Sequence, residues 1–185
     1  MDIKKSFCLI SLLLAVMFFV PSQGWTQPKP GKNGPIITHT FAVEKAYYGY
    51  IWKIYIEADD PNGDMVKIAS VVEQTGLGHY FTDWTYLKPQ YQKHFIGYLQ
   101  WNTYGSYANN LREWTQINLT VSVVDKAGNE SNQVVFPFTF QSGVPDPYKY
   151  TLPPPFDQGN LPRLGYIDVN LYEALPTGAA PIRTD

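Results

Sequence analysis

The sequence predicts an all-β protein whose body is a single antiparallel β-sandwich of about seven strands. Three observations support this prediction. Apolar and polar residues alternate with a period of two in several runs, which is the pattern of strands buried on one face. Turn-forming residues separate these runs at the regular spacing of a sandwich. Only one stretch, residues 109–114, could hold a helical turn.

Three runs show the alternation most clearly. Residues 50–58 place every second side chain toward a core, with Tyr55 among those expected to face solvent. Residues 116–125 and 133–140 follow the same rule. Because a proline has no N–H to donate to a neighbouring strand, Pro137 predicts that the last run lies at a sheet edge. Four weaker strands are expected at 36–41, 66–73, 80–84 and 94–101.

The two ends of the chain differ in composition from the middle. Residues 1–24 carry Lys4 and Lys5 near their start, continue with the apolar run 7–20 and end in small residues, which is the pattern of a secretory signal peptide cleaved after Gly24. The apolar run is shorter than the ~20 residues of a comfortable membrane span, although an uncleaved anchor is the alternative. The expected divisions are 1–24 signal peptide, 25–35 linker, 36–141 sandwich, and 142–185 proline-rich extended tail with a further strand at 164–172. The predicted location is therefore secreted or periplasmic.

The composition of the mature chain excludes several kinds of chemistry. Cleavage after Gly24 would leave 185 − 24 = 161 residues without the single cysteine, Cys8. That excludes disulfides, thiolate metal sites and a cysteine nucleophile. The basic residues fall to 14 − 2 = 12 and the acidic residues to 16 − 1 = 15. With no basic stripe to hold a phosphate backbone, we expect no nucleic-acid partner.

The tail contains a second strand-like pattern beyond its prolines. In residues 164–175, Ile167, Val169 and Leu171 alternate with polar or aromatic neighbours. This segment could fold back onto an open edge of its own sandwich. It could instead be donated to the sheet edge of a neighbouring molecule, where main-chain hydrogen bonds would provide affinity. The sequence leaves both alternatives open.

Two segments resemble a known group of domains. "VSVVDKAGNESN", residues 121–132, resembles the F strand, turn and G strand of bacterial immunoglobulin-like and fibronectin type III-like domains. "IEADDPNGDMVKI", residues 56–68, is similar to the segment between the second and third strands of PKD and cadherin-like domains. The resemblance implies an immunoglobulin-like (Ig-like) sandwich with an adhesive or scaffolding role, and it implies no activity. The chain lacks the tryptophan-containing third-strand motif of PKD domains and the paired cysteines of antibody domains.

The acidic loop in the second segment has two interpretations. A turn needs only Pro61, Asn62 and Gly63, all of which are present. An EF-hand calcium loop is excluded because Met65 stands where glycine is required and Val71 stands where a glutamate is required. A cadherin-like calcium site remains the alternative, completed by ligands from another loop and built on Asp59, Asp60 and Asp64.

Aromatic side chains are abundant, since 5 Trp, 14 Tyr and 10 Phe make 29 of 185 residues. Residues 79–107 contain more of them than the inward positions of a sandwich can absorb. Exposed rings on a sandwich suit stacking on sugar faces or packing against a protein. Core packing is the alternative for each ring. The candidate ligand-binding residues are Trp84, Tyr86, Tyr91, Trp101 and Tyr104.

A catalytic constellation is hard to find in this sequence. The three histidines are isolated, and no nucleophile elbow, phosphate loop or dinucleotide fingerprint occurs. Asp83 and Glu113 could form a carboxylate pair across strands, but any sandwich with this many acidic residues offers such pairs. The chain is therefore interpreted as non-enzymatic.

The sequence leads to two functional hypotheses. The first is an exported Ig-like module that acts in protein–protein interaction, or as a structural part of a cell-envelope or extracellular assembly. The rival is a carbohydrate-binding module that uses the exposed aromatic residues. No cofactor is expected apart from the calcium alternative, and no membrane span is expected in the mature chain.

Overall fold

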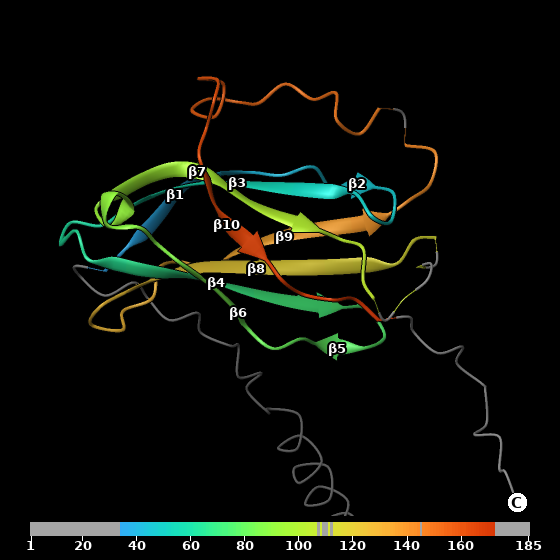
Figure 1. Cartoon of the computed structure of the whole chain (residues 1–185), viewed down its shortest axis with the longest axis horizontal. Helices are drawn as coiled ribbons and strands as arrows, with labels where there is room; N and C mark the ends of the chain where they lie inside the picture. Colours follow the sequence, from blue (N-terminus) through green and yellow to red (C-terminus); the bar gives the residue numbers. More distant parts are fainter. Residues whose placement is uncertain (1–33, 107, 109–110, 112, 145, 173–185) are drawn as a thin grey trace, which may run out of the picture.

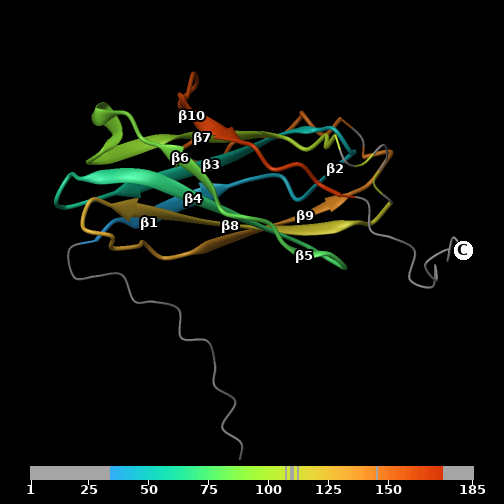
Figure 2. The ribbon, with the colours of Figure 1, turned by 60° about the horizontal axis from the view of Figure 1, so that its bottom comes forward.

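The protein folds as two β-sheets packed face to face (Figure 1). The structure is a computed structural model that describes residues 34–106, 108, 111, 113–144 and 146–172. The expected signal peptide and nearly all of the linker lie outside the described residues. Sheet A has the strand order β1-β3-β7-β10, and sheet B has the order β2-β9-β8-β4-β5 with β6 also paired with β4. In Figure 2 the two layers are seen with β7 and β10 above β8 and β9.

The described residues contain ten strands and one short helix. They are β1 (Ile36–Phe41), β2 (Lys45–Ala46), β3 (Ile51–Asp59), β4 (Met65–Gln74), β5 (Gly78–His79), β6 (Asp83–Tyr86), the 3₁₀ helix η2 (Pro89–Tyr91), β7 (His94–Asn102), β8 (Gln116–Asp125), β9 (Val134–Phe140) and β10 (Arg163–Ile167). Within these residues no helix is long and apolar enough to cross a membrane.

The predicted all-β sandwich is confirmed, with differences in detail. The sheets are mixed, because β10 pairs with β7 and β2 pairs with β9 in the parallel direction. The single strand expected at 80–84 is wrong, since two short strands, β5 and β6, pair with opposite ends of β4. Between them the side chain of Tyr80 turns toward the sandwich, where its hydroxyl donates a hydrogen bond to Gln74.

Pro137 lies at a sheet edge, as predicted, although only part of β9 forms this edge. On one side β9 pairs with β8 along its length, and Pro137 lies opposite Asn118. On the other side the two-residue strand β2 pairs only with Thr139 and Phe140. Pro137 therefore lies on the open part of this edge, where its missing N–H leaves no ladder bond unmade.

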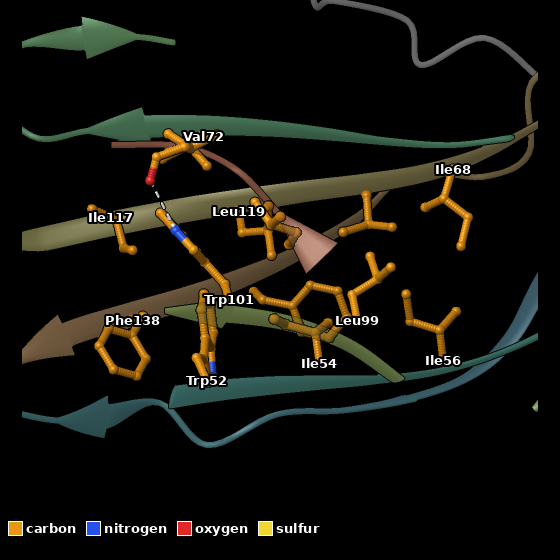
Figure 3. Close-up of a cluster of buried hydrophobic side chains, with 14 of the residues drawn as sticks. Trp52, Ile54, Ile56, Ile68, Val72, Leu99, Trp101, Ile117, Leu119 and Phe138 are labelled. Carbon is orange, nitrogen blue, oxygen red and sulfur yellow. Dashed lines mark hydrogen bonds between the residues drawn. The ribbon is translucent and has the colours of Figure 1, made fainter. Parts of the chain in front are cut away.

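The core lies between the sheets and is built around two tryptophans (Figure 3). Trp52 of β3 and Trp101 of β7 are fully buried and lie side by side, with ring centroids 6.1 Å apart. The Trp52 ring also contacts Phe138 of β9 at 4.5 Å. Each indole N–H donates to a backbone carbonyl, Trp52 to Val43 at 2.9 Å and Trp101 to Val169 at 3.0 Å. Both large rings are thus buried without an unpaired donor, as buried indoles require.

The outer face of sheet A is covered by a segment that we call the strap, residues 146–162. Tyr55 was expected to face solvent, and this expectation is wrong because it is only 5% exposed. Its ring contacts Phe156 of the strap at 5.7 Å, and its hydroxyl lies 3.3 Å from that of Tyr150. Phe156 is itself 1% exposed. A second, smaller apolar layer therefore lies outside the sandwich, between sheet A and the strap.

The segment after the strap, residues 163–172, folds back onto its own sandwich. Strand β10 pairs with β7, and the side chains of Ile167, Val169 and Leu171 are buried in the core. Glycines permit this close approach. A Cβ atom at Gly97 would lie 2.6 Å from the Pro162 carbonyl oxygen, a separation that real Cβ atoms essentially never show. The structure therefore places this segment in its own sheet.

Candidate binding groove

The five aromatic candidates do not form one exposed strip. Trp101 lies in the core with 1% of its surface exposed, so its proposed role as a surface platform is wrong. Its inward position follows from the period-two alternation of β7, which places Leu99 and Trp101 on the same buried face. Tyr91, in η2, is half-buried and packs against the core. The three remaining candidates lie on two different sheets.

Trp84 and Tyr86 lie on β6 and face outward from sheet B. Trp84 stands opposite Ala69 of β4, and the Lys67 ammonium lies 3.8 Å from the centre of its ring. This cation–π contact occupies one face of the ring. Tyr86 is 73% exposed. These two rings are therefore separate from Tyr104, which follows β7 of sheet A.

A groove of about 580 Å³ lies on the outer side of sheet A, and Tyr104 is one of its walls. Its size is within the range of about 300–1,000 Å³ that is typical of small-ligand sites. Strands β3 and β7 contribute Ile51, Gln100 and Asn102, and residues 166–170 contribute the opposite wall. The groove therefore joins two strands from the middle of the chain to one segment of the tail.

The parallel pairing of β10 with β7 creates this arrangement. Tyr166 is in register with Gln100, and Ile167 is in register with Trp101. Because Ile167 and Trp101 both point into the core, their neighbours along each strand point outward. Two rows of outward side chains thus lie beside each other. They are Gln100, Asn102 and Tyr104 on one side and Tyr166, Asp168 and Asn170 on the other.

Three amide side chains in the groove are held through their oxygen atoms. The Asn102 Oδ1 atom accepts a hydrogen bond from the Tyr104 backbone N–H at 3.2 Å. The Asn170 Oδ1 atom accepts from the Ser106 N–H at 3.3 Å, and the Gln100 Oε1 atom accepts from an Arg163 N–H at 3.4 Å. Since each partner is a donor, the amide orientation is fixed, and the NH₂ groups are left with no acceptor among the described residues.

Each groove tyrosine is supported on one side. The ring of Tyr104, 55% exposed, packs against that of Tyr48 with centroids 5.6 Å apart. The ring of Tyr166, 57% exposed, lies under the Arg163 guanidinium, whose central carbon is 4.2 Å from the ring centre. Both rings are thus fixed by a neighbour and still present more than half of their surface to solvent.

A second carboxyl group, Asp83 of β6, lies behind the groove wall. Burial raises its pKa, and the negative charge of Asp168 raises it further, while backbone N–H donors from Asp168 and Trp84 act in the opposite direction. Its Oδ2 atom is buried and has no hydrogen-bond partner in the part of the chain that the structure describes. Asp83 and Glu113, which the sequence analysis considered and discounted as a carboxylate pair, have different partners, since Glu113 accepts the Ser142 backbone N–H at 2.8 Å.

The acidic loop forms the turn that was one of its two interpretations. Both carboxylate oxygens of Asp60, which is 2% exposed, accept backbone N–H groups, from Asn62 at 3.1 Å and Asp64 at 3.0 Å. Gly63 has a φ of 72°, the left-handed conformation that a turn glycine provides. Asp59 instead pairs with His94, with 2.9 Å between Oδ1 and Nδ1. Within the described ranges, no group of three or more histidine, aspartate or glutamate side chains is placed to hold a metal ion.

Sequence reasoning missed most of the groove. Gln100, Asn102 and Ile51 were not among the candidate residues. The alternation in the tail did place Tyr166, Asp168 and Asn170 on one face. What no local pattern indicated was that this face would lie beside β7, because the pairing joins positions more than sixty residues apart.

No protein-family model and no curated protein matches the chain. Two solved structures are distantly similar to part of it, and both are Ig-like β-sandwich folds. The PKD domain of an M14-like peptidase from a Thermoplasmatales archaeon is 19% identical with a TM-score of 0.39, covering 58% of this chain and 95% of that one. The CARDB domain of a Pyrococcus furiosus protein, solved in complex with di-metal ions, is 14% identical with a TM-score of 0.30, covering 63% and 93%. The fold assignment rests on the strand order of this chain.

Proposed function

We propose that this protein is an exported, non-catalytic binding module whose ligand lies in the groove on the outer side of sheet A. One observation supports this most directly. Six outward side chains from two distant segments meet there, and three of them are amides already oriented by the protein. A site whose polar groups are fixed before the ligand arrives loses less conformational entropy on binding.

The groove chemistry supports binding over catalysis. Its single carboxylate, Asp168, stands among amides and tyrosines, with no histidine, serine or lysine in the groove lining. Glycoside hydrolases of the common kind use two carboxyl groups that flank the bond to be cleaved. Asp83 is the nearest described carboxyl with an altered pKa, and it is used in a contact between β6 and the tail. These features favour a site that holds its ligand unchanged.

Export is the second part of the proposal, and it is supported by residues 1–24. A lysine-containing start, an apolar run and a small-residue exit are the features that secretion systems recognise. Expression of the full chain in a bacterial host, followed by fractionation and N-terminal sequencing, tests this part. We expect a mature protein in the periplasm or medium that begins at Trp25. An unprocessed cytoplasmic chain would contradict it.

The binding role can be tested without knowing the ligand. The purified mature protein is mixed with the native envelope fraction, and the sedimented share is measured. We expect the double variant Asn102→Asp with Tyr166→Ala to lose at least about tenfold in retention, since two contacts of about 0.7 kcal/mol or more each would be removed. The matched control is Asn118→Asp with Tyr86→Ala, which makes the same changes on the exposed side of sheet B.

The two variants separate the possible outcomes. Loss in the groove variant with normal retention in the control supports the proposed function. Equal retention of wild type and groove variant would overturn the groove as the binding site. Loss in the control alone would return the site to the aromatic residues of β6. Thermal unfolding of each variant shows that the fold is intact.

A further inference from the structure

We infer that the ligand of the groove is a neutral glycan, held by two tyrosine platforms and three amide donors. This inference rests on the proposed binding function and names its ligand class. The protein partner considered from the sequence is the competing class. The chemistry of the groove distinguishes the two.

The tyrosines provide flat surfaces of the kind that sugar rings contact. Tyr104 and Tyr166 line the same groove, and each is supported on one side by Tyr48 or Arg163. The exposed part of such a ring presents a π-face with partial negative charge. The C–H groups on one side of a pyranose carry partial positive charge and form an apolar patch, so they fit this surface.

The amides provide donors at fixed positions in the same groove. The oxygens of Gln100, Asn102 and Asn170 accept protein N–H groups, so their NH₂ groups are the parts available to a ligand. Sugar hydroxyls and ring oxygens accept such hydrogen bonds. Asp168, which is exposed, supplies the complementary acceptor for a hydroxyl that donates. A polyhydroxylated ligand can satisfy donors and acceptor together.

The charge in the groove argues for a neutral ligand. Asp168 is the one acidic side chain among the described lining residues, and the nearest cation shown by a contact is Arg163. The Arg163 guanidinium stacks on Tyr166 and donates to Gln100, so it orients the wall. Arg163 therefore holds Tyr166 and Gln100 in position and does not itself face the ligand. An anionic sugar would meet the carboxylate without a free cation in the lining to offset the repulsion.

A protein partner fits the groove less well. Protein–protein interfaces have an apolar central region surrounded by a polar rim. Here three amides and a carboxylate line the groove together with the two tyrosines, and Ile51 is the exposed aliphatic side chain among the described lining residues. The arrangement places polar groups where a protein interface would have its apolar centre.

The test is a depletion assay with purified mature protein and three insoluble neutral probes: cellulose, chitin and β-1,3-glucan. We expect the wild type to be depleted by at least one of them. Asn102→Asp keeps the oxygen that accepts the Tyr104 N–H and removes the NH₂ donor. We expect it to weaken binding about threefold to tenfold, the size of one hydrogen bond. Tyr166→Ala should weaken binding by a similar factor, whereas Tyr166→Phe, which keeps the ring, should weaken it less than Tyr166→Ala does.

Two matched controls complete the assay. Asn118→Asp makes the same chemical change on an exposed strand position of sheet B, and Tyr86→Ala removes an exposed ring outside the groove. Both should bind as the wild type does. Loss of binding in Tyr86→Ala with full binding in Tyr166→Ala would overturn the inference.

The assay also separates this inference from the proposed function. If no probe depletes the wild type while groove variants lose retention on the envelope fraction, the glycan class is wrong and the binding role stands. If a defined protein is then captured through the groove, the competing class is correct. If groove variants change neither measurement, both proposals fail.

Discussion

The outer faces of the two sheets differ, although their strands follow the same alternating pattern. On sheet A the strap covers Tyr55 and buries Phe156, and the tail adds strand β10 beside β7. Among the described residues no such segment covers the outer face of sheet B, and β8 presents Asn118 to solvent. The comparison shows that alternation predicts which way a side chain points. Whether that direction leads to water depends on chain segments far away in the sequence.

The comparison predicts that the stability of the fold depends strongly on the tail segment that completes sheet A. Truncation after Pro162 removes Ile167, Val169 and Leu171 from the core and leaves the Trp101 indole without its acceptor. Loss of one buried leucine side chain alone costs about 2–5 kcal/mol, so the truncated chain should be unfolded or nearly so at 25 °C. Circular dichroism and urea denaturation measure this. A cooperative transition at the wild-type midpoint would contradict it.

A single substitution tests the layer beneath the strap. Phe156→Ala removes a ring that is 1% exposed, and we expect the free energy of unfolding to fall by about 3–5 kcal/mol. The matched control is Phe81→Ala, since Phe81 is 97% exposed and its removal should change stability by less than about 0.5 kcal/mol. Urea denaturation compares the two. Similar small losses for both would mean that the strap does not pack on sheet A as described.

The contact between tail and sheet B can be tested through a glycine. A Cβ atom at Gly165 would overlap the methyl group of Thr85 on β6. We expect Gly165→Ala to cost about 1–3 kcal/mol, as overpacking of a well-filled site does. Adding Thr85→Ser removes that methyl group and should recover part of the loss. A double-mutant cycle with no coupling would contradict this contact.

Much of the sandwich could be predicted from the sequence, because its strands obey local rules. The run 36–41 matches β1 at both ends, and the alternation of β8 places Ile117 and Leu119 in the core as expected. The predicted strand boundaries are wrong where a strand is interrupted. Between β5 and β6, residues 80–82 leave the ladder, and the side chain of Tyr80 turns toward the sandwich. Tyr55 was misplaced because the strap that buries it begins ninety residues later.

The candidate site was less predictable than the fold. Of the five aromatic residues proposed, Tyr104 alone lines the groove, and Trp101 is in the core. The number of aromatic residues in a region does not indicate which rings lie in the core and which are exposed. The orientation of the groove amides is set by hydrogen bonds from backbone N–H groups and from Arg163. The register of β10 against β7 determines which residues lie beside them. No pattern within one strand contains that information.

The smallest expected effect is a change in stability with pH, and it comes from Asp83, where the tail meets sheet B. Burial raises the pKa of Asp83 in the folded protein, so folding favours its protonated form. The stability that protonation contributes is fully present below the unfolded pKa of about 4 and is lost as pH rises through the higher folded pKa. Asp83→Asn stays neutral throughout. We therefore expect this variant to gain stability relative to the wild type as pH rises from about 4 to 7, measured by urea denaturation at constant ionic strength. A stability difference that is constant with pH, or that favours the wild type more at neutral pH, would show that the Asp83 carboxylate stabilises the contact between β6 and the tail in its charged form.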